Sequence, residues 1–390
     1  MASEPEPPLS SPQESTALRR AQFIALDSSH LGNLARERVS KDASIRQGAA
    51  ALEQAIKERG YILVLSMHHF QELLVYNDSD VVAQRIAFIQ SLPLVGVINS
   101  ILGEGVAGSV FDIQASEVLA AFQRPNATPR AIRDEVATQM FRLTSGAEAV
   151  RPFLVDLPAI QAELTMMAEK HRNIVAITSS DFAKISKKVV ELIKGKLHAP
   201  LDIQRNLARL EAALSEDIRQ HGDERISSPD SVSAAFMADI RRRGLALADG
   251  GNPGLQILAA CDVEPTEITP TTTVGEVGEW AVFRGKLKRL NRVLQLPWDG
   301  LKTRVKEERI PSGVISSALA RFRPRTDEWK GSDLIDVHLA CLSPYADITF
   351  VDKRTHEGLR IARQKTQELP RIIHRVEKAK NTRVILEHLR

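Results

Sequence analysis

The chain has little of what marks several large classes of protein. It contains only two cysteines, Cys261 and Cys341, in 390 residues. This scarcity excludes a disulfide framework and a cysteine-rich zinc module, and it favours a reducing, cytoplasmic setting. Aromatic residues make up only 5% of the chain, which argues against a large platform on which nucleic-acid bases would stack.

Two well-known catalytic loops are also missing. The sequence has no Gly-x-x-x-x-Gly-Lys-Ser/Thr loop, which disfavours a nucleotide-driven motor, and no Gly-x-Ser-x-Gly nucleophile elbow. One Gly-x-Gly-x-x-Gly match occurs at Gly103–Gly108, but it lacks the acidic residue expected about 20 positions later. We interpret it as a chance match or a packed glycine turn.

No segment predicts a membrane span or a targeting signal. The most apolar stretch, Leu92–Phe111, contains Glu104 and four glycines, so we interpret it as buried core. Residues 1–20 are rich in proline, glutamate and serine and lack the apolar centre of a signal peptide. They predict a disordered tail.

Charge and length leave several architectures open. The chain has 52 Lys and Arg against 49 Asp and Glu, for a net charge of +3. This balance permits a polyanionic partner but does not require one. Apolar residues make up 43% and charged residues 26%, as in ordinary globular proteins. The length allows two or three domains, or one domain with a large insertion.

The sequence pattern predicts α/β structure at the two ends of the chain and helices in the middle. Apolar runs at Phe23–Leu26 and Tyr61–Leu65, with a helical period at Ser44–Arg59 between them, predict parallel strands joined by crossover helices. Near the other end, Ile348–Val351 predicts a strand and Arg383–Leu386 a final strand. Periodicity in the middle is helical, as at Arg130–Leu143, Pro158–Lys170, Asp181–Ile193, Leu201–Arg219 and Ser231–Leu247.

The simplest architecture is one interrupted α/β domain. We expect a small parallel sheet flanked by helices over residues 21–115 and 326–390, with a large all-helical insertion at 116–325. Helix should dominate overall. The insertion would supply substrate selection, inhibition, self-association or contacts to a protein regulator.

Acidic residues recur where such a sheet would place a ligand site. Asp27 and Asp352 each follow a strand, and ligands of parallel α/β sheets bind beyond the carboxyl ends of the strands. Glu72 lies about two turns into a helix that Ser66 would cap. Asp333 and Asp336 share one face of a helix near its start. Each acid alone is explained as a helix cap or dipole partner.

Taken together, the acids predict a cation site. Clustered carboxylates repel one another, and hard oxygen ligands suit Mg²⁺ or Mn²⁺. The matching chemistry is hydrolysis of a phosphodiester, in which the metal lowers the pKa of a bound water and neutralises developing charge.

The acidic segments resemble the PIN-domain nucleases. That family shows an Asp after the first strand, a Glu in a following helix, an Asp that opens a late helix and an Asp after a late strand. The matching segments are Phe23–Ser29, Ser66–Leu74, Gly331–His338 and Ala346–Asp352. The resemblance implies a metal-dependent nuclease that acts mostly on RNA, with Asp27, Glu72, Asp333 and Asp352 as the acidic quartet.

The resemblance also assigns supporting residues. Asp336 would be a fifth acid at the metal site, and Ser29 sits where the family has a polar residue that supports that site. The chain departs from the family before its last aspartate, where Thr349 stands one place further back than the usual Thr or Ser. The helical middle is not covered by the resemblance.

Other signals have weaker chemical meaning. Lys353 and Arg354 directly follow Asp352 and would contact substrate phosphate, although solvated helical faces explain such basic runs equally well. The basic stretches Arg284–Arg292 and Lys184–Lys196 are partly ordinary amphipathic helices. A zinc site that uses His68, His69 or His338 has no His-x-x-x-His pattern behind it.

Two other functions stay open. A catalytically silent PIN-like scaffold could bind nucleic acid or protein without cleaving it, and a nuclease of this type could act on DNA. Cleavage that requires a divalent cation distinguishes a nuclease from the silent scaffold. RNA and DNA substrates of the same sequence distinguish an RNA-directed from a DNA-directed nuclease.

Overall fold

The computed structural model describes residues 21–76, 78–101, 103, 105–179, 200–247, 258–259, 262–324 and 330–389. The predicted tail at 1–20 and the predicted helix Asp181–Ile193 lie outside these residues. The chain forms two compact units. One comprises residues 1–113, 133–155 and 339–390 and holds the sheet, and the other comprises residues 114–132 and 156–338 and is helical. The predicted insertion began at 116, yet residues 133–155 group with the sheet.

The first unit is built on a six-stranded sheet in the order β4-β3-β2-β1-β5-β6. The strands are β1 (Gln22–Leu26), β2 (Tyr61–Leu65), β3 (Val95–Ile98), β4 (Phe141–Thr144), β5 (Ile348–Val351) and β6 (Arg375–Lys378). Five of them are parallel to their neighbours, and β4 pairs antiparallel with β3 at one edge. The α/β class is therefore confirmed, but the sheet is mixed rather than wholly parallel.

The edge strand β4 lies in a segment that we predicted to be helical. The helical period found over Arg130–Leu143 ends early, because α7 covers only Pro129–Ala137. Phe141–Thr144 then pairs with Val95–Ile98 across four residue pairs. Gly96 makes room at this edge, since a Cβ there would come within 2.9 Å of the Phe23 ring. That ring packs on Phe141 with a centroid distance of 4.5 Å.

The direction of the chain reverses between β1 and β5. From β1 it winds outward through β2 to β3, whereas from β5 it winds the other way to β6. Because parallel crossovers are right-handed, the helices of the two halves cover opposite faces of the sheet. The first half contributes α2 (Ser28–Arg38), α3 (Ala43–Glu58), α4 (Met67–Leu74) and α5 (Ser79–Gln90), and the second α18 (Lys353–Lys365), followed by the short α19 (Leu369–Ile372).

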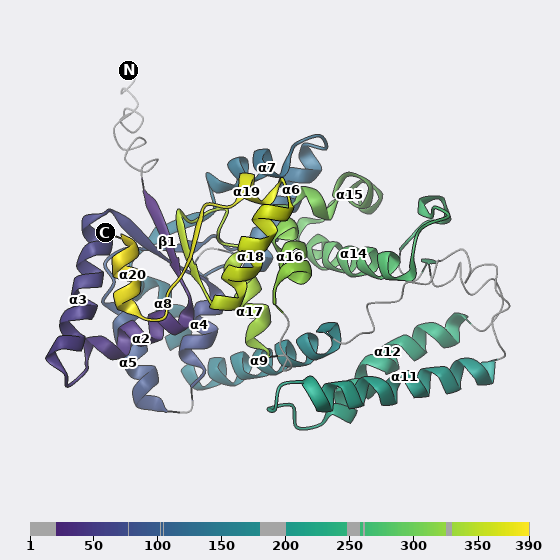
Figure 1. Ribbon diagram of the computed structural model, residues 1–390, viewed down its shortest axis with the longest axis horizontal. Helices are drawn as coiled ribbons and strands as arrows, with labels where there is room; N and C mark the ends of the chain where they lie inside the picture. Colours follow the sequence, from purple (N-terminus) through teal and green to yellow (C-terminus); the bar gives the residue numbers. More distant parts are fainter. Residues whose placement is uncertain are drawn as a thin grey trace, which may run out of the picture. The chain divides into compact units, whose positions relative to one another are not determined.

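The predicted last strand is a helix instead. Arg383–Leu386 belongs to α20 (Thr382–Leu389), which packs on α2 and α3 (Figure 1). The buried residues of α20 are Thr382, Ile385 and Leu389, and this spacing is helical. The strand lies earlier, at β6, where only Val376 is buried.

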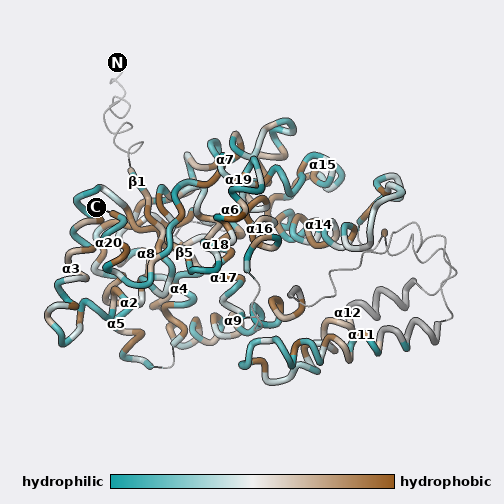
Figure 2. The backbone as a smooth tube through the Cα atoms, viewed as in Figure 1, coloured by the Kyte–Doolittle hydropathy of each residue, from teal (hydrophilic) through white to brown (hydrophobic). Residues whose placement is uncertain are grey.

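The core of the first unit explains why its central strands read as continuous apolar runs. Ile24, Ala25, Leu26, Val64 and Phe350 are fully buried, since helices cover both faces of the sheet. Hydrophobic segments gather in the interior of this unit (Figure 2). Its remaining helix, α8 (Gly146–Leu154), packs against α5 and β3, and its Phe153 stacks on Phe70 of α4.

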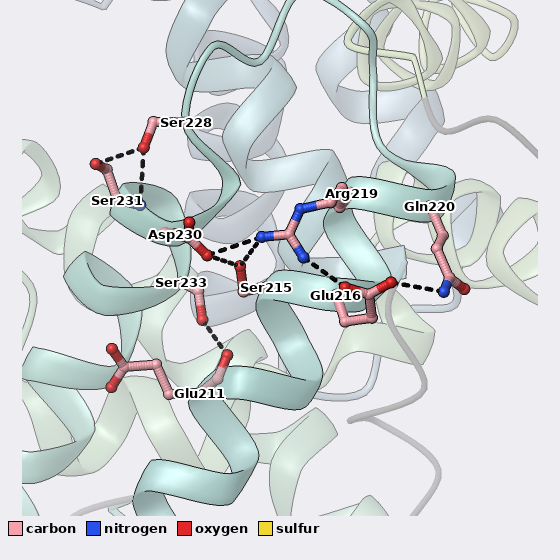
Figure 3. Close-up of polar contacts among 9 residues, drawn as sticks. All are labelled: Glu211, Ser215, Glu216, Arg219, Gln220, Ser228, Asp230, Ser231 and Ser233. Atoms are coloured by element: carbon pink, nitrogen blue, oxygen red, sulfur yellow. Dashed lines mark hydrogen bonds and ion pairs between the residues drawn. The ribbon is translucent and has the colours of Figure 1, made fainter.

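The second unit is helical. Its longer helices are α9 (Leu157–Ser179), α11 (Pro200–His221), α12 (Pro229–Leu247), α14 (Val274–Leu294) and α16 (Pro311–Phe322), with α15 (Trp298–Arg304) between them. The helices α6 (Val110–Gln123), α7 and α17 (Ser332–Ala340) each run from one unit into the other. Helices α11 and α12 form a hairpin fixed by polar contacts around Arg219, Ser215 and Asp230 (Figure 3).

No helix within the described residues is both long and apolar enough to cross a membrane.

Candidate functional site

Asp27 and Asp352 lie at the point where the sheet changes direction. The strands β1 and β5 are parallel neighbours, with Leu26 paired to Phe350, and the Asp27 N–H donates to the Phe350 carbonyl at 3.1 Å. The condition for their convergence, that the two strands be neighbours, is thus met. In open α/β sheets, this switch point at the carboxyl ends of the strands is where ligands bind.

Both aspartates also act as helix caps. Asp27 Oδ1 accepts from the Ser29 N–H at 2.7 Å at the start of α2. Asp352 accepts from the N–H groups of Arg354 and Thr355 at 2.8 and 3.0 Å at the start of α18. Capping therefore fixes the orientation of each carboxylate.

Glu72 joins this edge of the sheet from α4. Its side chain is half-buried and accepts a hydrogen bond from Ser28, the residue after Asp27. Removal from water and the negative charge of Asp27 raise the pKa of Glu72 to about 7, and the Ser28 bond and the Arg85 guanidinium offset part of that effect. Glu72 and Asp27 thus repel each other, as expected for paired carboxylates without a cation.

A histidine of α4 ties this helix to the end of β1. The buried His69 donates from Nε2 to the Leu26 carbonyl at 2.8 Å, and its Nδ1 accepts from the Ser66 N–H at 2.9 Å. Burial lowers the pKa of His69 and favours the neutral ring. Both ring nitrogens are occupied, which removes His69 from the zinc alternative. The Ser66 cap with a polar side chain three residues later was the available sequence signal.

Arg85 of α5 carries a positive charge that interacts with Glu72. Its guanidinium donates to the carbonyls of Glu72 and Leu73 at 3.4 and 3.1 Å and lies over the Tyr76 ring at 4.7 Å. It therefore completes the C-terminal turn of α4 while it partly balances the Glu72 carboxylate. Nothing in the sequence around Arg85 indicates this role, which depends on the packing of α5 against α4.

Asp333 and Asp336 belong to the second unit and are paired there with Arg323. Its Nη2 lies 3.4 Å from Asp333 Oδ1 and 2.7 Å from Asp336 Oδ2, and Nη1 donates to the Asp333 carbonyl at 3.0 Å. The predicted shared face of the two acids is thus present, with an arginine on it. Whether these acids join Asp27, Glu72 and Asp352 in one site stays a prediction.

The hairpin of the helical unit anchors the residue before α17. The buried Asp223, between α11 and α12, accepts from the Gly331 N–H at 3.2 Å and from Arg225. Although burial opposes it, these bonds lower the pKa of Asp223 to about 2. Gly331 is packed closely, since a Cβ there would lie 2.5 Å from Arg172 Cγ. The start of the helix bearing Asp333 is therefore held by α9 and the hairpin.

The predicted metal site is not formed as a ligand cluster in this structure. Within the described parts of the chain, no group of three or more His, Cys, Asp or Glu side chains lies close enough together to hold a metal ion. The structure brings together only some of the predicted ligands. Asp27 and Asp352 share a sheet edge, and Glu72 is coupled to Asp27.

The predicted substrate contacts lie around the two capping aspartates. Ser29 is exposed in the first turn of α2, and Lys353 is exposed at the first position of α18. Arg354 is half-buried, and its N–H donates to Asp352. Of the two basic residues, Lys353 is thus the one open to an anion.

The basic run on α14 is engaged inside its own unit. Arg284 contacts Glu267 and the Asp262 carbonyl, Lys288 pairs with Asp262, and Lys286 pairs with Glu307 at 3.5 Å. These pairs support the interpretation of Arg284–Arg292 as an amphipathic helix. The stretch Lys184–Lys196 lies outside the described residues.

The glycine-rich match has a structural role at its end. The Gly108 N–H donates to the Ile98 carbonyl at 2.8 Å, and the Gly108 carbonyl accepts from the Met67 N–H at 2.9 Å. A Cβ at Gly108 would lie 2.7 Å from the Asn99 carbonyl oxygen. Gly108 is thus closely packed and fixes the start of α4.

Comparison with known proteins adds no relative: neither a family model, nor a curated protein, nor a solved structure matches this chain.

Proposed function

We propose that the chain is a Mg²⁺- or Mn²⁺-dependent endonuclease that hydrolyses phosphodiester bonds in RNA. The observation that carries the proposal is the placement of Asp27 and Asp352 on adjacent strand ends at the switch point, with Glu72 coupled to Asp27. The choice of RNA follows from the resemblance to PIN-domain nucleases.

The three acidic side chains at this edge are of the ligand type that a hard divalent cation prefers, although among the described residues they are not gathered closely enough to hold one. All three offer carboxylate oxygens, the ligands that Mg²⁺ and Mn²⁺ prefer. Burial first, and then the negative charge of Asp27, raise the pKa of Glu72, and a cation at this edge would favour its ionised form. A bound cation would supply charge neutralisation at the phosphodiester and a lowered pKa for an attacking water.

Each protein group would have a separate task. The caps on α2 and α18 hold Asp27 and Asp352 in fixed orientations. Ser28 orients the Glu72 carboxylate. Asp333 would complete the quartet, with Asp336 beside it, once Arg323 no longer balances their charge. Ser29 and Lys353 would contact the substrate.

The proposal is tested by an Asp27→Asn variant matched with Asp42→Asn. Asp42 caps α3 in the same way, with Oδ1 accepting from the Ser44 N–H at 2.8 Å. Asparagine caps helices about as well as aspartate, so both variants should keep their caps. Asp27→Asn should lose Mn²⁺-dependent RNA cleavage by on the order of 100-fold or more, because outer partners of metal ligands alone contribute about 10–100-fold.

The control decides how the result is interpreted. Asp42→Asn should cleave at the wild-type rate in the same Mn²⁺ buffer. If both variants cleave like the wild type, Asp27 is not a metal ligand. If both fail equally, the loss reflects helix capping or charge in general and not this site.

A catalytically silent scaffold is the second candidate, and two observations favour it. No described cluster of ligands is preformed, and Arg323 pairs with both acids of α17. Wild-type protein that binds RNA but leaves it intact at saturating Mg²⁺ and Mn²⁺ would establish this alternative. A DNA strand of the same sequence, assayed in parallel, shows whether the enzyme cleaves DNA instead of RNA.

A further inference from the structure

The strand next to β5 brings lysines to the edge that carries Asp352. In the β5–β6 ladder, Val351 is paired with Lys378, so Lys378 stands beside the residue that precedes Asp352. Asp352 and Lys378 are 26 residues apart in the sequence. Because the last strand was expected at Arg383–Leu386, the sequence could not place Lys378 at this edge.

The loop after β6 is held in place by α2. His30, in the first turn of α2, donates from Nε2 to the Ala379 carbonyl at 2.8 Å. Just beyond the loop, Thr382 Oγ1 donates to Glu37 of the same helix at 2.6 Å. Lys380 therefore projects from a loop that is pinned on both sides to the helix that begins after Asp27.

Three lysines form what we call the lysine rim: Lys353, Lys378 and Lys380. All three are exposed, and none forms an ion pair within the described residues. Two acids near Lys378 are paired with arginines, Glu377 with Arg375 at 2.8 Å and Glu357 with Arg360 at 2.7 Å, and Glu357 also interacts electrostatically with Lys378.

Lys378 and the start of α18 lie close enough to interact. Burial first, and then the positive charge of Lys378, lower the pKa of His356 on α18. His356 is three residues after Lys353, hence about one turn along the same helix. Lys378 on β6 thus lies beside the end of β5, and Lys353 on α18 directly follows Asp352.

We propose that the lysine rim binds the backbone phosphates of a single-stranded nucleic acid next to the carboxylates of Asp27 and Asp352. The location as a substrate surface rests on the proposed nuclease function, whereas binding itself does not require cleavage. Lysines suit this task as point charges that contact phosphate without reading the base. The scarcity of aromatic residues also favours contact through phosphate over base stacking.

The test compares two double variants that each remove two positive charges from the sheet unit. Lys378→Ala/Lys380→Ala removes two members of the rim. Lys57→Ala/Lys365→Ala removes two exposed lysines that precede β2 and end α18, and both of these lie toward the opposite, amino edge of the sheet. The probes are a fluorescent single-stranded RNA and a DNA of the same sequence. Their binding is measured by fluorescence anisotropy in EDTA at salt concentrations between about 50 and 300 mM, a range over which affinity through phosphate contacts falls strongly.

The rim variant should bind both strands more weakly, and its plot of log affinity against log salt should be shallower by about 1.4, or 0.7 for each lost phosphate contact. The control should keep the wild-type slope. Thermal melting of each variant shows that the fold is kept. Equal slopes for the two variants, no binding by the wild type, or an effect on one strand type only would each overturn the proposal.

The outcomes for binding and for catalysis are separable. Binding that depends on the rim, with no cleavage by the wild type in Mn²⁺, would keep the rim and reject the nuclease. Cleavage by the wild type, with unchanged binding in the rim variant, would reject the rim and keep the nuclease.

Discussion

At the scale of single residues, burial and three neighbours set the pKa of Glu72. Removal from water and repulsion by Asp27 raise it, and together they outweigh Ser28 and Arg85, which lower it. The result is a carboxyl group that is close to half-protonated near neutral pH. A cation at this edge would reverse the balance, because it would favour the ionised form.

This balance predicts how stability depends on pH. The folded-state pKa of Glu72 is raised from 4.5 to about 7, so between these values the folded chain binds more protons than the unfolded chain. The favourable contribution of the protonated group is complete below 4.5 and is lost as pH rises through 7. Glu72→Gln should remove this loss and, at pH 8 in EDTA, raise the free energy of unfolding by on the order of 2–3 kcal/mol relative to the wild type.

Urea unfolding at pH 5 and pH 8 measures the effect as a difference between variant and wild type. Glu58→Gln is the control, since Glu58 is exposed on α3 and its Oε1 accepts from Gln54. Parallel pH profiles for Glu72→Gln and the wild type would contradict the raised pKa.

At the scale of elements, the site depends on how α4 is fastened to β1. Asp27 and Glu72 come from different elements, and His69 joins them through the Leu26 carbonyl and the Ser66 N–H. The turn at Gly108 holds the first residue of α4 from the other side. Fixed elements on either side keep the two carboxylates close despite their repulsion.

Loss of this connection should be costly. His69→Ala leaves a buried carbonyl and a buried N–H unpaired and removes buried ring volume, so we expect a destabilisation of about 2–4 kcal/mol. His69→Gln offers one amide oxygen and one N–H in place of the two ring nitrogens and should recover part of that loss. Urea unfolding of both variants measures it. If His69→Ala and His69→Gln were equally stable, the hydrogen bonds of His69 would contribute little to stability.

At the scale of the whole chain, the sequence predicted the interior strands β1, β2 and β5 but not β3, which is also interior and lies in the stretch Leu92–Phe111 that we interpreted only as buried core. The strands β1, β2 and β5 are covered on both faces, so their apolar runs were visible. The edge strand β6 has one buried residue, Val376, and β4 is four residues long after a helical period, so neither gave a clear pattern. The capping of α2 and α18 by Asp27 and Asp352 followed from the same strand ends.

The remaining features depend on contacts distant in sequence. Arg323 precedes α17, yet no local pattern indicates that it pairs with Asp333 and Asp336. The lysine rim requires the register of β5 with β6. Apolar runs thus predicted three of the interior strands, whereas the partners of charged side chains follow only from the fold.

The central claim is that Asp27 and Asp352 hold a divalent cation. Crystals of the protein grown in Mn²⁺, with diffraction data collected at the manganese absorption edge, test it directly. The account predicts an anomalous peak at the carboxyl ends of β1 and β5, with oxygens of both aspartates about 2.0–2.6 Å from it. Ordered Asp27 and Asp352 side chains with no peak between them, at a Mn²⁺ concentration that supports cleavage, would contradict it.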